Sequence, residues 1–233
     1  MARSRRYRTA ESPFKLTGNY ALTFAGMLAV YLIFEWLWGD LILLSFGDLA
    51  KFDLTGLVKV WFIFAWAFAA TWVLGKLFGQ SDEDPAEIFT SGLWISLNAG
   101  VFEELIYRWL VFFSAMVVIP VFDWVIPWDL WRLLYTEILI PLANFTTFGA
   151  LEPQLYHPAS WVVGAAIVSA SIAFRDVHAY LGLIGLVNSW FFGMVMFYLT
   201  FNYGILVAII AHVLYDVIVF STIAAGAKRR SIW

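Results

Sequence analysis

Long apolar stretches alternate with short polar segments along the whole chain. The stretches are long enough to cross a bilayer as helices, and clusters of Gly, Pro, Asp and Lys separate them. The expected spans cover about 20–38, 57–78, 88–119, 133–151, 161–181, 186–200 and 205–225. The pattern therefore predicts an all-α fold, a polytopic transmembrane helix bundle of about seven spans.

The distribution of charge constrains the number of spans. Basic residues stand at both ends of the chain, which favours the cytoplasmic side for both termini and hence an even number of crossings. A further crossing in 39–50 or 120–131 would satisfy this rule, so the range is six to eight. We expect an N-terminal arm with two accessory helices in 1–87, the main bundle in 88–225 and a basic tail in 226–233. We further expect a multi-pass protein of the cell membrane with a cytoplasmic N-terminus.

Proline marks one expected boundary. The third span is longer than the roughly 30 Å of hydrocarbon that a helix must cross, and we expect it to end before Pro120. Residues 120–131 are rich in Pro, Asp and Trp. That composition predicts an interfacial loop or a short re-entrant segment.

Composition supports the membrane assignment and excludes other classes. The chain of 233 residues is 62% hydrophobic and 13% charged, whereas a soluble domain is about 45–50% apolar and about 25% charged. The basic residues gather at the ends and form no face for nucleic acid. Cysteine is absent, which excludes disulfides, thiolate metal sites and a cysteine nucleophile.

Ionisable residues interrupt the third span. Glu103, Glu104 and Arg108 lie within an apolar run, where an ionisable group is costly and is therefore a candidate functional residue. On a helix, Glu104 and Arg108 are one turn apart and can pair. Glu103 points about 100° away from Glu104 and has no obvious local partner.

Two histidines complete the polar inventory of the apolar body. His178 follows Phe174 by one helical turn, and His212 precedes Asp216 by one turn. Between the two histidines the chain contains no Asp, Glu, Lys or Arg. Both rings must reach a similar depth to act together, so we expect the fifth span to continue past His178, to Gly182 or Gly185.

Three motifs follow one another in the order Glu-Glu-x-x-x-Arg (103–108), Phe-x-x-x-His (174–178) and His-x-x-x-Asp (212–216). In this order, on successive membrane helices, they resemble the CAAX protease and bacteriocin-processing (CPBP/Abi) family of intramembrane proteases, which includes CAAX prenyl endopeptidases of the Ras-converting type. The resemblance covers about 88–225. It implies an intramembrane endopeptidase whose partners are the lipid bilayer and a membrane-tethered peptide or protein, with a prenylated substrate as one candidate.

The resemblance also implies the catalytic roles. Glu103 would be the general base that activates water, assisted by His178. His212 and the residue one turn later, Asp216, would stabilise the oxyanion of the tetrahedral intermediate, because donors gain strength where water is scarce. Asn is common in the family where this chain has Asp216, and an ionised Asp cannot donate a hydrogen bond.

The remaining motif residues would support the site. The resemblance assigns Glu104 and Arg108 as a structural pair that holds the helix and the site together. Trp109 stands where family members often have Gly, and Arg175 and Asp176 add charges between the phenylalanine and the histidine of the second motif.

The sequence leaves metal chemistry and two other functions open. Glu103, His178 and His212 could supply nitrogen and oxygen ligands to zinc, but the chain has no His-Glu-x-x-His motif. We therefore favour metal-free hydrolysis with no cofactor and keep zinc as the minority alternative. The alternatives to a peptidase are a catalytically silent membrane scaffold or immunity-type binding protein, and a proton-coupled transporter.

Overall fold

The computed structural model of the protein describes residues 84–158 and 160–226, together with a few single positions between residues 21 and 69. The two continuous ranges belong to one compact unit, residues 43–233. Apart from those few positions, the spans predicted over 20–38 and 57–78 lie outside the described residues. The predicted boundary between 1–87 and the main bundle stays a prediction.

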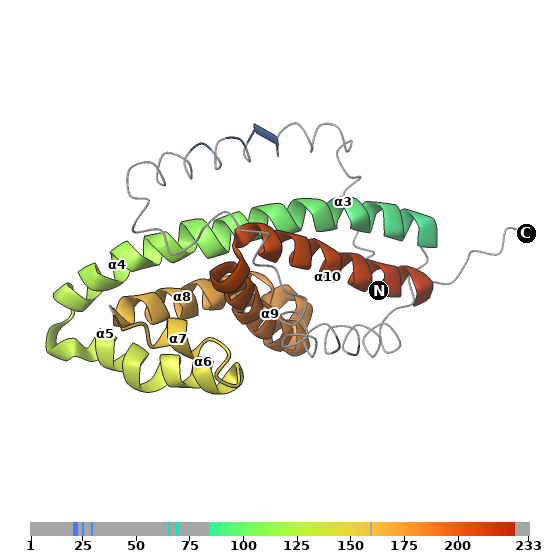
Figure 1. Ribbon diagram of the computed structural model, residues 1–233. Coiled ribbons are helices and arrows are strands. Elements are labelled where there is room, and N and C mark those ends of the chain that lie inside the picture. The colour runs from blue at the N-terminus through green and yellow to red at the C-terminus, as the bar shows by residue number, and fades with distance from the viewer. Residues whose placement is uncertain are drawn as a thin grey trace, which may run out of the picture. The chain divides into compact units, whose positions relative to one another are not determined.

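The two continuous ranges are built from helices alone, which confirms the all-α fold class (Figure 1). In chain order the elements are α3 (Pro85–Glu103), the π-helical η3 (Glu104–Val111), α4 (Phe112–Val125), the 3-10 helix η4 (Pro127–Asp129), α5 (Leu130–Leu133), the π-helical η5 (Leu134–Leu139), α6 (Ile140–Thr146), α7 (Glu152–Leu155), α8 (Trp161–Val177), the 3-10 helix η6 (Ala179–Leu181), α9 (Gly182–Tyr203) and α10 (Ile205–Gly226).

Within the described ranges, three helical stretches are long and apolar enough to cross a membrane: Pro85–Val125, Ala179–Tyr203 and Ile205–Gly226. The first contains 41 residues, so at about 1.5 Å per residue it is about twice as long as the hydrocarbon layer is thick. It must therefore tilt strongly or project from the bilayer. α8 is shorter, with 17 residues, and the total of about seven spans stays a prediction.

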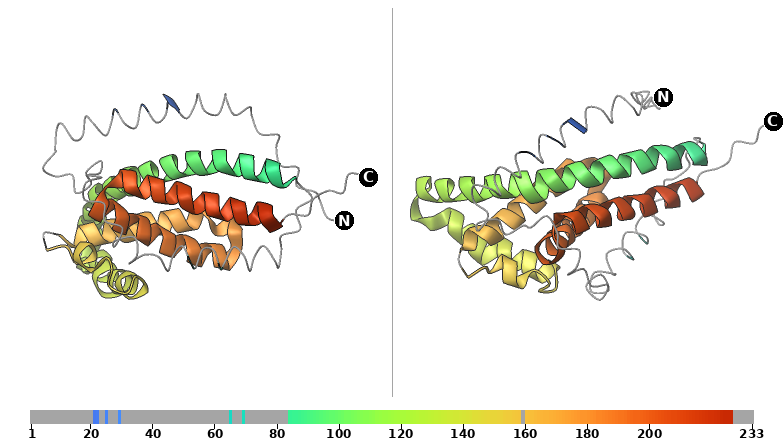
Figure 2. Two further views of the ribbon diagram at one scale, coloured as in Figure 1. Left: turned by 45° about the vertical axis from the view of Figure 1, so that its right-hand side comes forward. Right: turned by 45° about the horizontal axis from the view of Figure 1, so that its top comes forward.

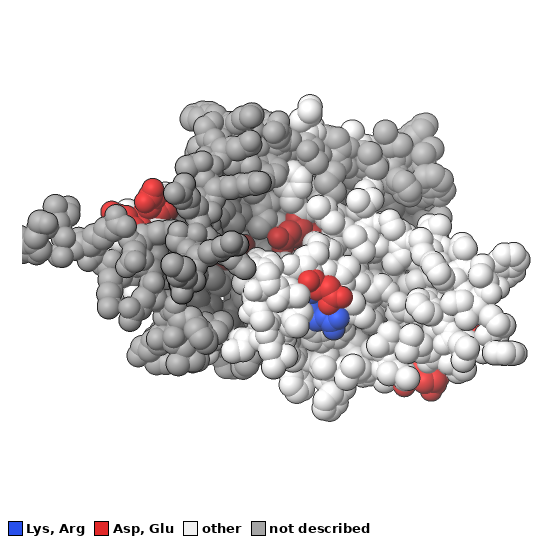
Figure 3. Space-filling model, turned by 180° about the vertical axis from the view of Figure 1, so that it is seen from behind, with Lys and Arg blue, Asp and Glu red and all other residues white. Residues whose placement is uncertain are grey.

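The outer surface of these helices is apolar. Phe89, Leu93, Trp94 and Ile95 of α3 are all exposed, and Figure 3 shows a face on which charged side chains of the described residues are sparse. Large contiguous apolar surfaces are rare on soluble monomers. Together with the three long apolar helices, this surface indicates a membrane protein.

The prediction that the third span ends before Pro120 is wrong. Pro120 lies inside α4, which continues to Val125, and a membrane helix tolerates an internal proline because neighbouring groups satisfy the freed carbonyl. The helix ends instead at Ile126, whose backbone is extended (φ −88°, ψ 117°). Ile126 precedes Pro127, and the residue before a proline is disfavoured in the helical region. Residues 120–131 are thus mostly helical and contain a sharp bend, with Trp128 at φ 67°.

Small residues bring α3 and α10 together. Gly92, Ser96 and Gly100 recur every fourth residue on the buried face of α3, and Figures 1 and 2 show this helix lying alongside α10. A Cβ atom at Gly100 would lie 2.5 Å from Cγ2 of Val213. Small residues at such a spacing let two membrane helices approach closely, and the close approach places α10 beside the end of α3.

The expectation that the fifth span continues past His178 is also wrong. α8 ends at Val177, and His178 is its C-terminal cap with φ −93° and ψ 7°. The short helix η6 follows, and Gly182 at φ 75° then opens α9, a conformation in which only glycine is unstrained. His178 therefore stands at the end of a helix, and its ring turns back toward α3 from there.

We expect Gly164→Ala to destabilise the protein, because a Cβ atom there would overlap the backbone carbonyl of Leu155 and lie 2.9 Å from Cδ1 of Ile140. Overpacking of this kind costs about 1–3 kcal/mol. The matched control is Gly193→Ala, whose new methyl group would meet its nearest neighbour, Phe174, at an ordinary 3.4 Å. Thermal unfolding of both variants in detergent should show a clear loss for the first only. Equal behaviour of the two would contradict the packing described for α7 and α8.

Candidate active site

Side chains from α3, α8 and α10 meet at Glu103, the last residue of α3. Its Oε2 atom lies 3.8 Å from Nε2 of His178 and 3.8 Å from Nε2 of His212. The Glu103 side chain is 27% exposed, whereas His212 is almost completely buried. The structure thus brings together three side chains that the sequence singles out over more than a hundred residues, and their catalytic roles stay predictions.

The backbone of α8 determines which nitrogen of His178 carries a proton. Nδ1 lies 2.8 Å from the carbonyl oxygen of Phe174, and because a carbonyl oxygen only accepts, Nδ1 is the donor. In the neutral ring Nε2 then presents its lone pair toward the carboxylate of Glu103. Two acceptors that face each other at 3.8 Å cannot hydrogen-bond directly. A water molecule that donates one hydrogen to each is the natural bridge over such a distance.

Glu104 is fully buried and contacts two partners on different helices. Its Oε2 atom lies 3.1 Å from Nε of Arg108, as the helical spacing predicts. Its Oε1 atom accepts a hydrogen bond of 2.6 Å from Nδ1 of His212 on α10. The second contact was not predicted. It assigns the Nδ1 proton of His212 and turns the Nε2 atom of that ring toward Glu103.

Arg108 is also fully buried and connects η3 with α8 and α9. Its Nη2 group donates to the carbonyl oxygen of Gly193 at 3.3 Å. The guanidinium carbon lies 4.5 Å from the centre of the Phe174 ring and 5.6 Å from that of Phe197. A buried guanidinium needs such partners, because an uncompensated charge in a low-dielectric interior is very costly.

Asp216 lies at the edge of the site. Its Oδ2 atom is 3.7 Å from Nε2 of His212, which is too long for a direct hydrogen bond. The preceding residue, Tyr215, is buried, and its hydroxyl accepts a hydrogen bond of 2.6 Å from the side-chain amide of Asn188 on α9. Phe192 of the same helix packs against both His212 and Tyr215, with ring centres 4.6 and 4.4 Å apart.

Sequence reasoning missed Asn188, Phe192 and Tyr215. Tyr215 could have been found, because it follows His212 by three residues and so shares its helix face. In α9 almost every residue is apolar, so nothing in the pattern distinguishes the face that carries Asn188 and Phe192.

Three motif residues that depart from the family pattern, Arg175, Asp176 and Trp109, find partners within the structure. Arg175 and Asp176 bond to each other at 2.8 Å, the first half-buried and the second exposed, so their charges compensate at the surface. Trp109 is buried, and its ring packs against Phe113. Across residues 84–158 and 160–226, no group of three or more His, Cys, Asp or Glu side chains is arranged to hold a metal ion. The zinc alternative stays a prediction.

The two adjacent glutamates should respond differently to the same substitution. Glu104→Gln leaves the buried Arg108 without a compensating charge, and the loss of one partner of a buried pair costs about 3–5 kcal/mol. Glu103→Gln changes a partly exposed group whose two imidazole neighbours lie 3.8 Å away, and we expect a change within about 1 kcal/mol. Thermal unfolding of the two variants in the same detergent provides the comparison. Similar losses would show that Glu103, too, is a structural residue.

Comparison with known proteins adds no assignment: no family model, no curated protein and no solved structure matches the chain. The resemblance to the CPBP family therefore rests on the three motifs.

Proposed function

We propose that the protein is an intramembrane endopeptidase of the CPBP type, which hydrolyses a peptide bond with a water molecule activated by Glu103 and His178. One observation carries the proposal: the Nε2 atoms of His178 and His212 both lie 3.8 Å from the same carboxylate oxygen of Glu103. A purely structural glutamate would more simply be joined to such partners by direct hydrogen bonds, as Glu104 is to His212.

In the proposed reaction Glu103 is the general base. The water that bridges Glu103 and His178 gives one proton to the carboxylate while its oxygen attacks the carbonyl carbon of the substrate. Glu103 is then a carboxylic acid and returns the proton to the amine that leaves. His178 orients the water through its unprotonated Nε2 atom, because its other nitrogen is committed to the carbonyl of Phe174.

His212 is the group that would stabilise the oxyanion. Glu104 accepts the Nδ1 proton of His212, and when the ring also carries a proton on Nε2 it donates from there toward the centre of the site. A donor whose direction is fixed before the reaction stabilises developing charge without reorganisation. The Arg108 charge balances that of Glu104, so the pair holds the ring without adding net charge.

The substrate class follows from the position of the site. Glu103 lies on the longest apolar helix of the described residues, so a peptide must be presented from the membrane to reach it. A prenylated C-terminus, a bacteriocin precursor or another membrane protein would meet this condition. The proposal includes a multi-pass protein of about seven spans in the cell membrane with a cytoplasmic N-terminus, and no requirement for a cofactor.

Cleavage by purified protein tests the proposal directly. In liposomes that contain a library of membrane-tethered peptides, we expect wild-type protein to cut at least one peptide and Glu103→Gln to lose about 10²- to 10⁴-fold in rate. Glu137→Gln, which neutralises an exposed carboxylate of η5, should retain the wild-type rate.

Two results would contradict the proposal. Cleavage that survives Glu103→Gln removes the mechanism. Absence of any cleavage by folded wild-type protein favours the scaffold alternative. A chelator added to the same assay, with and without subsequent zinc, separates metal-free hydrolysis from the zinc alternative.

Asp216→Asn tests how the oxyanion is stabilised. We expect this variant to keep at least the wild-type rate, because an amide can donate a hydrogen bond from the position beside His212 whereas an ionised carboxylate cannot. Asp216→Ala removes the side chain and serves as the comparison. A loss of tenfold or more in the Asn variant (about 1.4 kcal/mol in the barrier) would assign an acid–base role to the carboxylate itself.

A further inference from the structure

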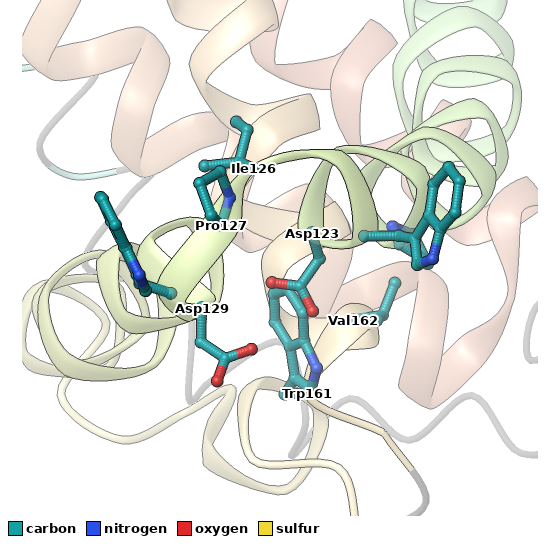
Figure 4. Close-up of a pocket in the computed structure, with 9 residues that line it drawn as sticks. Asp123, Ile126, Pro127, Asp129, Trp161 and Val162 are labelled. Carbon is teal, nitrogen blue, oxygen red and sulfur yellow. The ribbon is translucent and has the colours of Figure 1, made fainter.

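A concave region lies away from Glu103, where α4 ends and α8 begins (Figure 4). It encloses about 480 Å³, which is within the usual range for sites that bind small molecules. Its lining consists mainly of indole rings, proline rings and carboxylates. Tryptophan comes from three positions, Trp124, Trp128 and Trp161, and the carboxylates are those of Asp123 and Asp129.

One carboxylate oxygen in this pocket has no partner. Oδ1 of Asp123 is inaccessible to solvent and makes no hydrogen bond. The nearest basic residue in the sequence, Arg132, forms no ion pair within the described ranges. Within the described ranges the charge of this carboxylate is therefore uncompensated, which favours a cation in the pocket that Asp123 lines, although Oδ1 itself is closed to solvent and to a ligand. Figure 4 shows that the carboxylates of Asp123 and Asp129 both turn toward the side of the pocket on which Trp161 lies.

The chemistry of this lining is complementary to a cation. Indole is the aromatic ring that attracts a positive charge most strongly through its face, and aromatic cages are the common means by which proteins bind quaternary ammonium groups. A metal ion would require more oxygen ligands than two aspartates supply. An organic cation requires only the carboxylates for its charge and the rings for its methyl or methylene groups.

The place of the pocket indicates where the cation comes from. Trp124 and Trp128 are both largely exposed, and tryptophan on the outside of a membrane protein is enriched at the level of the lipid headgroups. The pocket also lies at the end of a 41-residue apolar helix. Ammonium groups of phospholipid headgroups are the most abundant organic cations at that level.

We propose that the pocket formed by Asp123, Asp129 and Trp161 binds an organic ammonium group, supplied by a choline or ethanolamine phospholipid headgroup. This site is independent of the proposed peptidase activity. α8 separates it from His178, and 17 helical residues span about 25 Å.

The soluble arm of the test uses choline and its uncharged isostere 3,3-dimethyl-1-butanol on protein in an amine-free detergent, with binding followed by calorimetry. Wild-type protein should bind choline at least about tenfold more tightly than the isostere. Asp123→Asn, which keeps the shape of the side chain, should abolish this preference, and Asp129→Asn should reduce it. Glu137→Gln removes a carboxylate that does not line the pocket and should leave the preference unchanged.

The lipid arm identifies the source of the cation. Native mass spectrometry should show that wild-type protein retains phosphatidylcholine or phosphatidylethanolamine in preference to phosphatidylglycerol with the same acyl chains, and that Asp123→Asn loses the preference. Choline binding without any lipid preference would overturn the headgroup as the source and leave a soluble amine. Equal binding of choline and the isostere, or equal behaviour of folded Asp123→Asn and Glu137→Gln, would overturn the site.

Discussion

The buried carboxylate of Glu104 is the interaction on which the rest of this structure depends. It contacts Arg108 on its own helix and His212 on α10, while Arg108 contacts Phe174 of α8 and Gly193 of α9. A single charge pair thus connects all four helices that surround the site. In a bundle whose helices are apolar on every side, dispersion packing alone leaves many rotational settings nearly equal in energy. A buried pair that makes its contacts in one arrangement only can select among them, a role that is supported in some proteins.

The two neighbouring glutamates therefore differ in their environments. Glu104 is fully buried against Arg108 and His212, whereas Glu103 is partly exposed and lies 3.8 Å from both imidazoles, too far for a direct hydrogen bond. The different environments follow from the helix, because adjacent residues point about 100° apart. The transition to the wider π-helical turns of η3 falls between them, and such turns are frequently found at functional sites.

The sequence predicts the parts of this structure that depend on rare residues. Charged and imidazole groups are scarce in the apolar body, so each one is informative, and the helical spacing of Glu104 and Arg108 predicts their contact. The same reasoning fails where every residue is apolar. The pattern could not reveal which face of α9 carries Phe192, because a helix that is hydrophobic all round has no distinguishable face.

The helix end near Pro120 was predicted wrongly because Pro120 and Pro127 look alike in sequence. Only the extended residue before Pro127, Ile126, ends the helix. The end of the fifth span was also predicted wrongly. We expected a longer helix to bring His178 level with His212, but a residue at the C-terminal cap of a shorter helix can reach the same position.

The length of α8 relates the two polar regions of the described bundle to each other. His178 follows its C-terminal end and Trp161 begins its N-terminal end, so the candidate active site and the aromatic pocket are about 25 Å apart, close to the thickness of the hydrocarbon layer. A headgroup held by Asp123 and Asp129 would define the level of one membrane face. If α8 crosses the bilayer at a small tilt, Glu103 then lies near the opposite face and not at the midplane. A site at that depth can receive water from the adjacent aqueous phase, and hydrolysis requires this supply at every turnover. If the protein is the proposed peptidase, the cut in a membrane-tethered substrate would then fall close to the boundary at which its chain leaves the lipid.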